Sequence, residues 1–240
     1  MTIVNWRELK NLVLVAAHAV YVADNFRNPA ADCNWYLQDF QKGEPPFYIE
    51  HIRESVRLAD EDRSALLVFS GGQTRAEAGP RSEGLSYWLI AQHFSWWQRT
   101  AAELRATTEE YARDSFENVL FGICRFWECT GKVPESVKVV SWAFKKRRFA
   151  MHFAALRFPA ARFEFVGAND PGNLADAQEG EQKAIALFET DPYGSGPVLG
   201  QKRDERNPFN RMHPYTASCP TLEQLLRHRG PDQFERPLPW

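Results

Sequence analysis

Several residue types suited to acid–base chemistry and anion binding follow an apolar run that ends at Ser70 of this 240-residue chain. Two glycines, Gly71 and Gly72, come directly after the run. Glycine permits positive φ and lets a ligand approach main-chain N–H groups, which is the geometry of an anion nest. A carboxylate partly desolvated beside such a loop has a raised pKa, so we expect Glu83 to be the general base. The predicted ligand-binding residues of this loop are Ser70, Gly71, Gly72, Thr74 and Ser82.

Structural explanations account for part of this loop. The segment matches neither G-x-G-x-x-G nor G-x-x-x-x-G-K-[ST], so it lacks the two well-known phosphate fingerprints. Any tight turn uses glycine. Thr74 and Glu77 fit a helix capping box, and Ser82 fits a plain N-cap. Glu83 is the residue that these alternatives explain least.

Polar side chains follow other apolar runs as well. His18 comes after the run 11–17 and is a second candidate for proton transfer, although a lone histidine on an apolar segment is more often structural. Asp114, Ser115 and Asn118 open a helical pattern and are predicted to bind the ligand. An N-cap role explains either of the first two residues but not Asn118.

Two cations predicted to bind an anion, Lys145 and Arg148, lie at the start of the helical pattern 144–158. Cations at a helix N-terminus oppose the macrodipole by about 0.3–1 kcal/mol each, so a cluster of them needs a compensating anion. A solvated basic face is the alternative interpretation.

The elements that must position these residues alternate along the chain. Continuous apolar runs predict strands, and apolar residues at helical spacing between the runs predict helices. Strands without inside–outside alternation suit a parallel sheet covered on both faces. The predicted fold class is therefore α/β, a Rossmann-like three-layer sandwich with a mostly parallel sheet of about five strands and an irregular C-terminal tail. The expected strands are 11–17, 65–70, 105–111, 137–142 and 162–167, and the expected helices are 47–62, 82–94, 115–131 and 144–158.

The last fifty or so residues differ in composition from the rest. Residues 191–240 are rich in Gly and Pro, and only 221–229 has a helical pattern. Their aromatic residues suggest a tail that packs on the same domain as residues 1–190, with partial disorder as the alternative. We thus expect one domain with an attached tail.

Composition restricts the partners. Charge is nearly balanced, with 29 basic and 31 acidic residues, so no overall field recruits nucleic acid or an anionic membrane. The four cysteines lack metal-site spacing, which predicts no metal site and reduced thiols. The apolar run 12–23 is too short to span a bilayer, and together these features predict a cytoplasmic protein. The expected partner is a small-molecule anionic ligand; no partner protein and no cofactor can be named.

The order of these motifs resembles the domain of unknown function 218 family, the YdcF-like and SanA-like proteins. The motifs are SGGQT followed by SE, then ARDSFEN, then S-x-x-F-K-x-x-R-F, and the C-terminal sequence resembles the soluble fungal branch. The resemblance covers about 12–215 and implies a Rossmann-like fold with a polar cleft at the strand ends. Bacterial relatives usually carry a histidine near Lys145 and a glycine at Ala17, so their chemistry does not transfer directly. The resemblance implies polar site residues at Ser70, Gly71, Gly72, Thr74, Ser82, Glu83, Asp114, Ser115, Glu117, Asn118, Ser141, Lys145 and Arg148.

Two functions fit these observations. The first is an enzyme acting on a phosphorylated or nucleotide-bearing small molecule, with Glu83 or His18 moving protons and Lys145 and Arg148 holding the anion. The second is a non-catalytic module that binds or senses such a ligand. The concentration of acids, serines and lysines at strand ends favours the enzyme, whereas the lack of a nucleophile motif or dinucleotide fingerprint favours the module.

Overall fold

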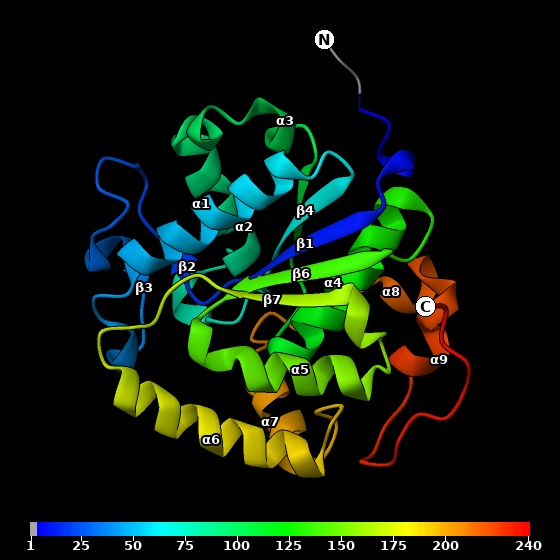
Figure 1. Cartoon of the computed structure of the whole chain (residues 1–240). Coiled ribbons are helices and arrows are strands. Elements are labelled where there is room, and N and C mark those ends of the chain that lie inside the picture. Colours follow the sequence, from blue (N-terminus) through cyan, green and yellow to red (C-terminus); the bar gives the residue numbers. More distant parts are fainter. Residues whose placement is uncertain (1–3) are drawn as a thin grey trace.

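A computed structural model describes residues 4–240, and a five-stranded parallel sheet lies at its centre (Figure 1). The strand order is β5-β4-β1-β6-β7, and helices cover both faces, which confirms the predicted α/β three-layer fold. All five expected strands are present, including the short fifth one. Their bounds are β1 Asn11–Ala16, β4 Ala65–Ser70, β5 Ala106–Glu109, β6 Ser136–Ser141 and β7 Phe163–Gly167.

The order in which the chain adds strands to the sheet reverses beside β1. The chain starts there, moves outward through β4 to β5, and then returns to the other side of β1 for β6 and β7. In the register, Leu14 of β1 lies between Val68 of β4 and Val139 of β6. A reversal of this kind is a topological switch point, and ligands of open α/β sheets bind beyond the carboxyl ends of the strands that flank it.

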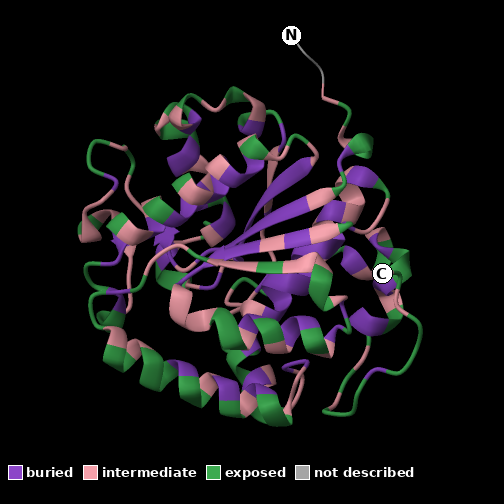
Figure 2. Cartoon of the chain, viewed as in Figure 1, coloured by how far each residue is buried: buried purple, intermediate pink, exposed green. Residues whose placement is uncertain are grey.

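The two faces of the sheet bury separate clusters. Leu12 and Leu14 of β1 belong to the cluster on the face of α4 and α5, while Val13 and Val15 belong to the cluster on the face of α1 and α2. The central strands β1 and β4 are accordingly buried between helices whose outer surfaces are exposed, whereas the edge strand β7 has no buried residue (Figure 2). The α-helices around the sheet are α1 Pro45–Glu61, α2 Glu83–His93, α3 Thr100–Glu103, α4 Ser115–Thr130, α5 Lys146–Ala155 and α6 Leu174–Thr190.

Helix α6 and a small second sheet were not predicted from the sequence. Helix α6 packs on the outside of α5, so only a narrow stripe with Ile185 and Phe188 is buried. The second sheet pairs β2 Val20–Tyr21 with β3 Trp35–Tyr36. The 3-10 helices are η1 Trp6–Glu8, η2 Asp32–Asn34, η3 Asp39–Gln41, η4 Ala76–Ala78, η5 Ser95–Gln98, η6 Ala143–Lys145, η7 Ala160–Arg162 and η8 Pro220–Leu222.

The segment 191–240 folds against the α4 and α5 face of the sheet. Tyr215, Cys219 and Leu222 are buried in the same cluster as α4, and Trp240 packs against Phe158. The segment contains more helix than expected: α7 Pro197–Glu205, α8 Tyr215–Ser218 and α9 Glu223–Leu226. Within residues 4–240, no helix is both long enough and apolar enough to cross a membrane.

Candidate functional site

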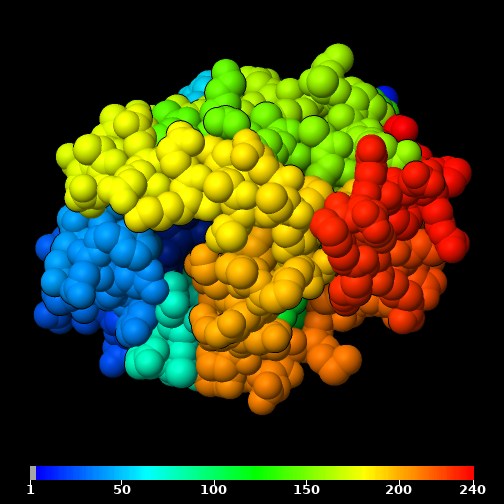
Figure 3. Space-filling model, turned by 90° about the horizontal axis from the view of Figure 1, so that it is seen from below, coloured from blue at the N-terminus to red at the C-terminus, as the bar shows by residue number. Residues whose placement is uncertain are grey.

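A cavity of about 610 Å³ opens at the carboxyl ends of the strands, and we call it the strand-end cavity. Figure 3 shows its opening as a hollow bordered by α6 (yellow), the loop before α1 (blue) and the segment that carries α7 (orange). Most of the predicted site residues line it: His18, Thr74, Glu83, Asp114, Ser115, Asn118, Lys145 and Arg148. The remaining predicted residues, including two that only the resemblance implied, are not part of its lining: Ser70, Gly71, Gly72, Ser82, Glu117 and Ser141.

The two glycines do not form the predicted anion nest. The N–H of Gly71 donates to the carbonyl of Glu109 at 3.0 Å, and the N–H of Gly72 donates to the carbonyl of Ala112 at 2.7 Å. Neither glycine has a positive φ. Close packing is what requires them, because a Cβ on Gly71 would lie 2.7 Å from Cβ of Glu83, and one on Gly72 would lie 2.7 Å from the Ala112 oxygen. The glycines therefore bring Glu83 and the start of α4 against the end of β4.

Glu83 is the first residue of α2, and Ser82 is the N-cap whose Oγ accepts the N–H of Leu85 at 3.0 Å. The Thr74 hydroxyl donates to Oε1 of Glu83 at 2.5 Å, so Thr74 does not form the capping box that its spacing allowed. Burial raises the pKa of Glu83, while the Thr74 hydrogen bond and nearby cations, Arg206 first, oppose that rise. A partly desolvated carboxyl group therefore lies where the sequence predicted one, and its role as a general base stays a prediction.

Ser70 belongs to a buried hydrogen-bond chain behind the cavity wall. Its Oγ donates to Oε2 of Glu109 at 2.6 Å and accepts from Nδ2 of Asn118 at 2.9 Å. Burial raises the pKa of Glu109 to about 7. Ser70 was predicted to bind the ligand, but it is fully buried and cannot contact one. Its hydroxyl instead orients Asn118. Asn118 does line the cavity, so this chain fixes one of its polar groups.

Asp114 and Ser115 are engaged by the protein itself. Asp114 is the N-cap of α4, where it accepts the N–H of Glu117 at 2.8 Å and Nε of Arg203 at 2.6 Å. Although burial raises it, the pKa of Asp114 is lowered overall by Arg203. Oγ of Ser115 lies 2.8 Å from Nε2 of His152, a ring whose pKa burial lowers to about 3. The capping explanation thus accounts for Asp114, and both residues have structural partners.

Lys145 and His18 lie together at the switch point. Nζ of Lys145 is 3.4 Å from Nδ1 of His18, and Nε2 of the same ring is 3.3 Å from Oγ of Ser141. Burial and then Lys145 hold the pKa of His18 well below its usual value, so the ring is neutral. When Lys145 is protonated, its ammonium can donate to Nδ1, and the ring then carries its hydrogen on Nε2, which faces Ser141. Burial also lowers the pKa of Lys145 to about 7. Lys145 is therefore a group that both donates and accepts protons near neutral pH.

Arg148 is already paired. Its guanidinium contacts Glu181 of α6 through Nε to Oε1 at 3.0 Å and Nη2 to Oε2 at 2.8 Å, and both side chains are largely buried. This bidentate pair ties α5 to α6 beside the cavity. It leaves Arg148 less available to a ligand than the sequence analysis expected.

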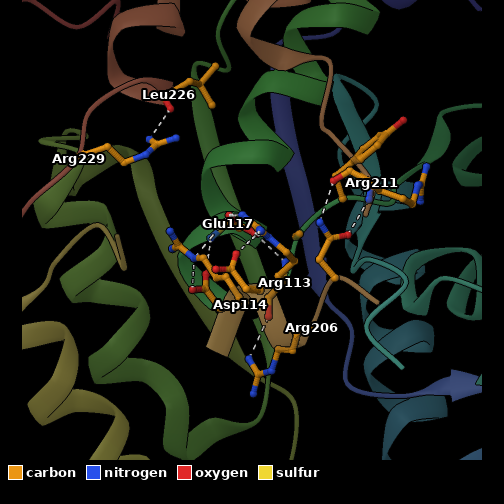
Figure 4. Close-up of polar contacts among 12 residues, drawn as sticks. Arg113, Asp114, Glu117, Arg206, Arg211, Leu226 and Arg229 are labelled. Carbon is orange, nitrogen blue, oxygen red and sulfur yellow. Dashed lines mark hydrogen bonds and ion pairs between the residues drawn. The ribbon is translucent and has the colours of Figure 1, made fainter. Parts of the chain in front are cut away.

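Two cations that line the cavity were not predicted from the sequence. Arg75, from the loop after β4, lies with two guanidinium nitrogens 3.0 and 2.8 Å from the side-chain amide of Gln38, which accepts from them when its oxygen is turned toward Arg75. Arg206, at the end of α7, donates to the carbonyl of Arg113 at 3.0 Å (Figure 4). Within residues 4–240, no carboxylate lies within 4.0 Å of the charged nitrogens of Arg75, Arg206 or Lys145. An SGG-x-x-R pattern was the available signal for Arg75; Arg206 had none.

Fold and site together define a Rossmann-like α/β protein with a polar cavity at its topological switch point. Comparison with known proteins finds an uncharacterized protein of Saccharomyces cerevisiae, YOR238W, that is 28% identical over an alignment 283 positions long. The alignment covers 95% of this chain and 93% of the yeast protein, so the likeness extends over nearly the whole length of both. No family model and no solved structure matches. Residues 4–240 contain no group of three or more His, Cys, Asp or Glu side chains arranged to hold a metal ion.

Proposed function

We propose that the strand-end cavity binds a phosphorylated or nucleotide-bearing small molecule and that the protein is an enzyme acting on this ligand. The observation that supports the proposal most strongly is the convergence of three cations without carboxylate partners, Arg75, Lys145 and Arg206, on the buried carboxyl of Glu83. Because the charge is nearly balanced and the apolar run 12–23 is too short to span a bilayer, we place this activity in the cytoplasm, on a soluble ligand rather than a nucleic acid or membrane.

Cations without a close carboxylate partner favour an anionic ligand. Arg113 and Arg148, which also line the cavity, are neutralised by Glu117 and Glu181. Among the described residues, Arg75, Arg206 and Lys145 have no carboxylate within 4.0 Å and act together on the carboxyl of Glu83, while Glu44 and Asp176 add negative charge elsewhere in the lining. A phosphate group accepts several charge-assisted hydrogen bonds at once, so it suits this arrangement.

Proton transfer is assigned to Glu83 and Lys145. A carboxylate with a raised pKa takes a proton from an attacking hydroxyl or water, and a lysine with a pKa of about 7 gives one to the leaving oxygen. His18 acts through Lys145, because its neutral Nδ1 accepts from the ammonium and fixes its position. His18 is therefore a positioning residue in this scheme, rather than the proton carrier considered above.

Arg206→Gln tests the anion site. With pyrophosphate as the probe, we expect calorimetric titration to show affinity at least about tenfold weaker, since a hydrogen bond to a charged group contributes about 1.5–3 kcal/mol. Lys202→Gln, an exposed change in the same helix, is the matched control. Equal affinities of the two variants would show that Arg206 takes no part in anion binding.

Glu83→Gln separates an enzyme from a binding module. The ligand would first be identified by native mass spectrometry of gently purified protein. In an enzyme, Glu83→Gln is expected to reduce turnover about 10² to 10⁴-fold with little change in affinity, while Glu77→Gln, an exposed change in the same loop, has no effect. Turnover that survives Glu83→Gln would remove Glu83 from the mechanism.

A non-catalytic binding module is the second candidate. It is favoured by the engagement of Asp114, Ser115 and Arg148 with the protein's own side chains, which leaves few polar groups free for chemistry. In that case the wild-type protein would bind its native ligand and return it unaltered after prolonged incubation.

A further inference from the structure

A second cavity of about 330 Å³ lies between α4 and the segment 191–240. Part of its wall is apolar, with aromatic rings and leucines from both sides: Phe116, Leu120, Phe121, Tyr193, Leu225 and Leu226. The cavity is separate from the strand-end cavity, although Arg113 lines both. Its apolar wall suits a ligand with a hydrophobic body.

Two buried nitrogen atoms of the lining have no hydrogen-bond partner. One is Nη2 of Arg203, a residue that is 9% exposed. Nε of the same guanidinium donates to Asp114. Nδ1 of His213 is the other; its ring packs on Phe121 with centroids 4.6 Å apart. Burial lowers the pKa of His213, so the ring is neutral near pH 7 and can carry its hydrogen on Nδ1. Because unpartnered buried polar groups are costly, this pair points to an absent acceptor.

Gly194 shows that the chain makes room for the Arg203 guanidinium. A Cβ on this glycine would lie 2.4 Å from Nη2 of Arg203, and its φ of +63° is one that other residues rarely adopt. Both residues line the second cavity. The guanidinium therefore occupies the space that a side chain at position 194 would need, and the turn before α7 packs closely on Nη2.

One cation of the described lining lacks a carboxylate partner. Arg113 pairs with Glu117 (Figure 4) and lies 3.9 Å from the exposed carboxylate of Asp204, which also lines the cavity. Arg203 pairs with Asp114. Arg229 is bonded only to backbone oxygens, those of Leu226 and His228. Within residues 4–240, no carboxylate lies within 4.0 Å of the Arg229 guanidinium.

We propose that the second cavity is a binding site for a small organic monocarboxylate with an apolar body. The carboxylate would accept from Arg229, Nη2 of Arg203 and Nδ1 of His213, while the body packs on the rings and leucines. A phosphate dianion fits less well, because one unmatched cation cannot compensate two buried charges. The occupant is therefore chosen by single charge and apolar area together.

The site is placed to influence the strand-end cavity. Arg203 holds Asp114, the N-cap of α4, and Asp114 lines the strand-end cavity. A carboxylate bound at Nη2 of Arg203 would contact the same guanidinium whose Nε holds Asp114, so the two cavities share this side chain as a link.

Benzoate is the probe for calorimetric titration of the full chain. We expect saturable binding of benzoate, no binding of benzyl alcohol at the same concentrations, and weaker binding of inorganic phosphate. Arg229→Gln is expected to weaken benzoate binding about tenfold or more. Arg227→Gln, an exposed neighbour paired with Glu223, should leave the affinity unchanged.

Two further variants locate the probe. His213→Phe keeps an aromatic ring but removes Nδ1, so benzoate affinity should fall while the melting temperature is retained. Arg206→Gln alters only the strand-end cavity and should leave benzoate affinity unchanged. The proposal is overturned if benzoate does not saturate, if Arg229→Gln and Arg227→Gln behave alike, or if Arg206→Gln abolishes binding while Arg229→Gln does not. These outcomes leave the proposed function of the strand-end cavity untouched.

Discussion

Lys145→Met is expected to stabilise the protein at and below neutral pH. The pKa of Lys145 falls from 10.5 to about 7 on folding, chiefly because of burial. At about 1.4 kcal/mol per pH unit, that difference corresponds to roughly 5 kcal/mol of destabilisation. The side chain is partly exposed to the cavity, so water screens some of this cost, and we expect a gain of about 2–3 kcal/mol on substitution.

The effect of Lys145 on the free energy of unfolding depends on pH in a defined direction. Between pH 7 and 10.5 the unfolded chain keeps the Lys145 proton and the folded chain releases it, so the free energy of unfolding rises with pH. The penalty is complete below pH 7 and vanishes above pH 10.5. The gain from Lys145→Met should therefore be largest near pH 6 and shrink steadily toward pH 10.

Urea unfolding of the wild type and variants at pH 6, 7, 8, 9 and about 10 measures this difference. Lys146→Met is the matched control, because Lys146 is exposed in the first turn of α5 and should leave the pH slope unchanged. A destabilised Lys145→Met variant, or one whose slope equals that of the wild type, would show that Lys145 keeps an ordinary charge in the folded protein.

Two further predictions concern packing around the cavity. Gly72→Ala places a Cβ 2.7 Å from the Ala112 oxygen and should lower the free energy of unfolding by about 1–3 kcal/mol. The control Gly172→Ala meets nothing within 4 Å and should be neutral, so equal melting temperatures of the two variants would contradict the packing role of Gly72. Arg148→Gln leaves the buried carboxylate of Glu181 without its partner and should lower the free energy of unfolding, measured in urea, by about 3–5 kcal/mol. The double variant Arg148→Met/Glu181→Leu should recover most of this loss, and a double variant as unstable as the single one would contradict this account.

The centre of the sheet was predictable because β1 and β4 are buried on both faces. Runs such as 65–70 have no exposed side to interrupt their apolar character. Strand-end polar residues were predictable for the same reason, since parallel strands direct their carboxyl ends to one edge. Helix α6 was missed because it lies outside α5 and buries few apolar residues, so it has almost no helical apolar pattern.

The composition of the site depended on contacts that no local pattern encodes. The glycines were identified, but their packing against Glu83 and Ala112, rather than a positive φ, explains them. Glu181 was missed together with α6, so Arg148 was assigned to the ligand although it pairs within the protein. Arg206 enters the cavity from a Gly- and Pro-rich segment that was expected to be irregular.

The position of Arg206 in the chain has a consequence for the timing of assembly. The last strand ends at Gly167, so the ribosome has made all five strands, Glu83 and Lys145 before it adds Arg206. At about 5–20 residues per second, the interval between these two positions lasts roughly two to eight seconds. During that interval the nascent chain contains the residues of all five strands but lacks one of the cations around Glu83. Under the proposed function, a chain arrested on the ribosome before α7 is expected to retain no anionic ligand, because it lacks Arg206.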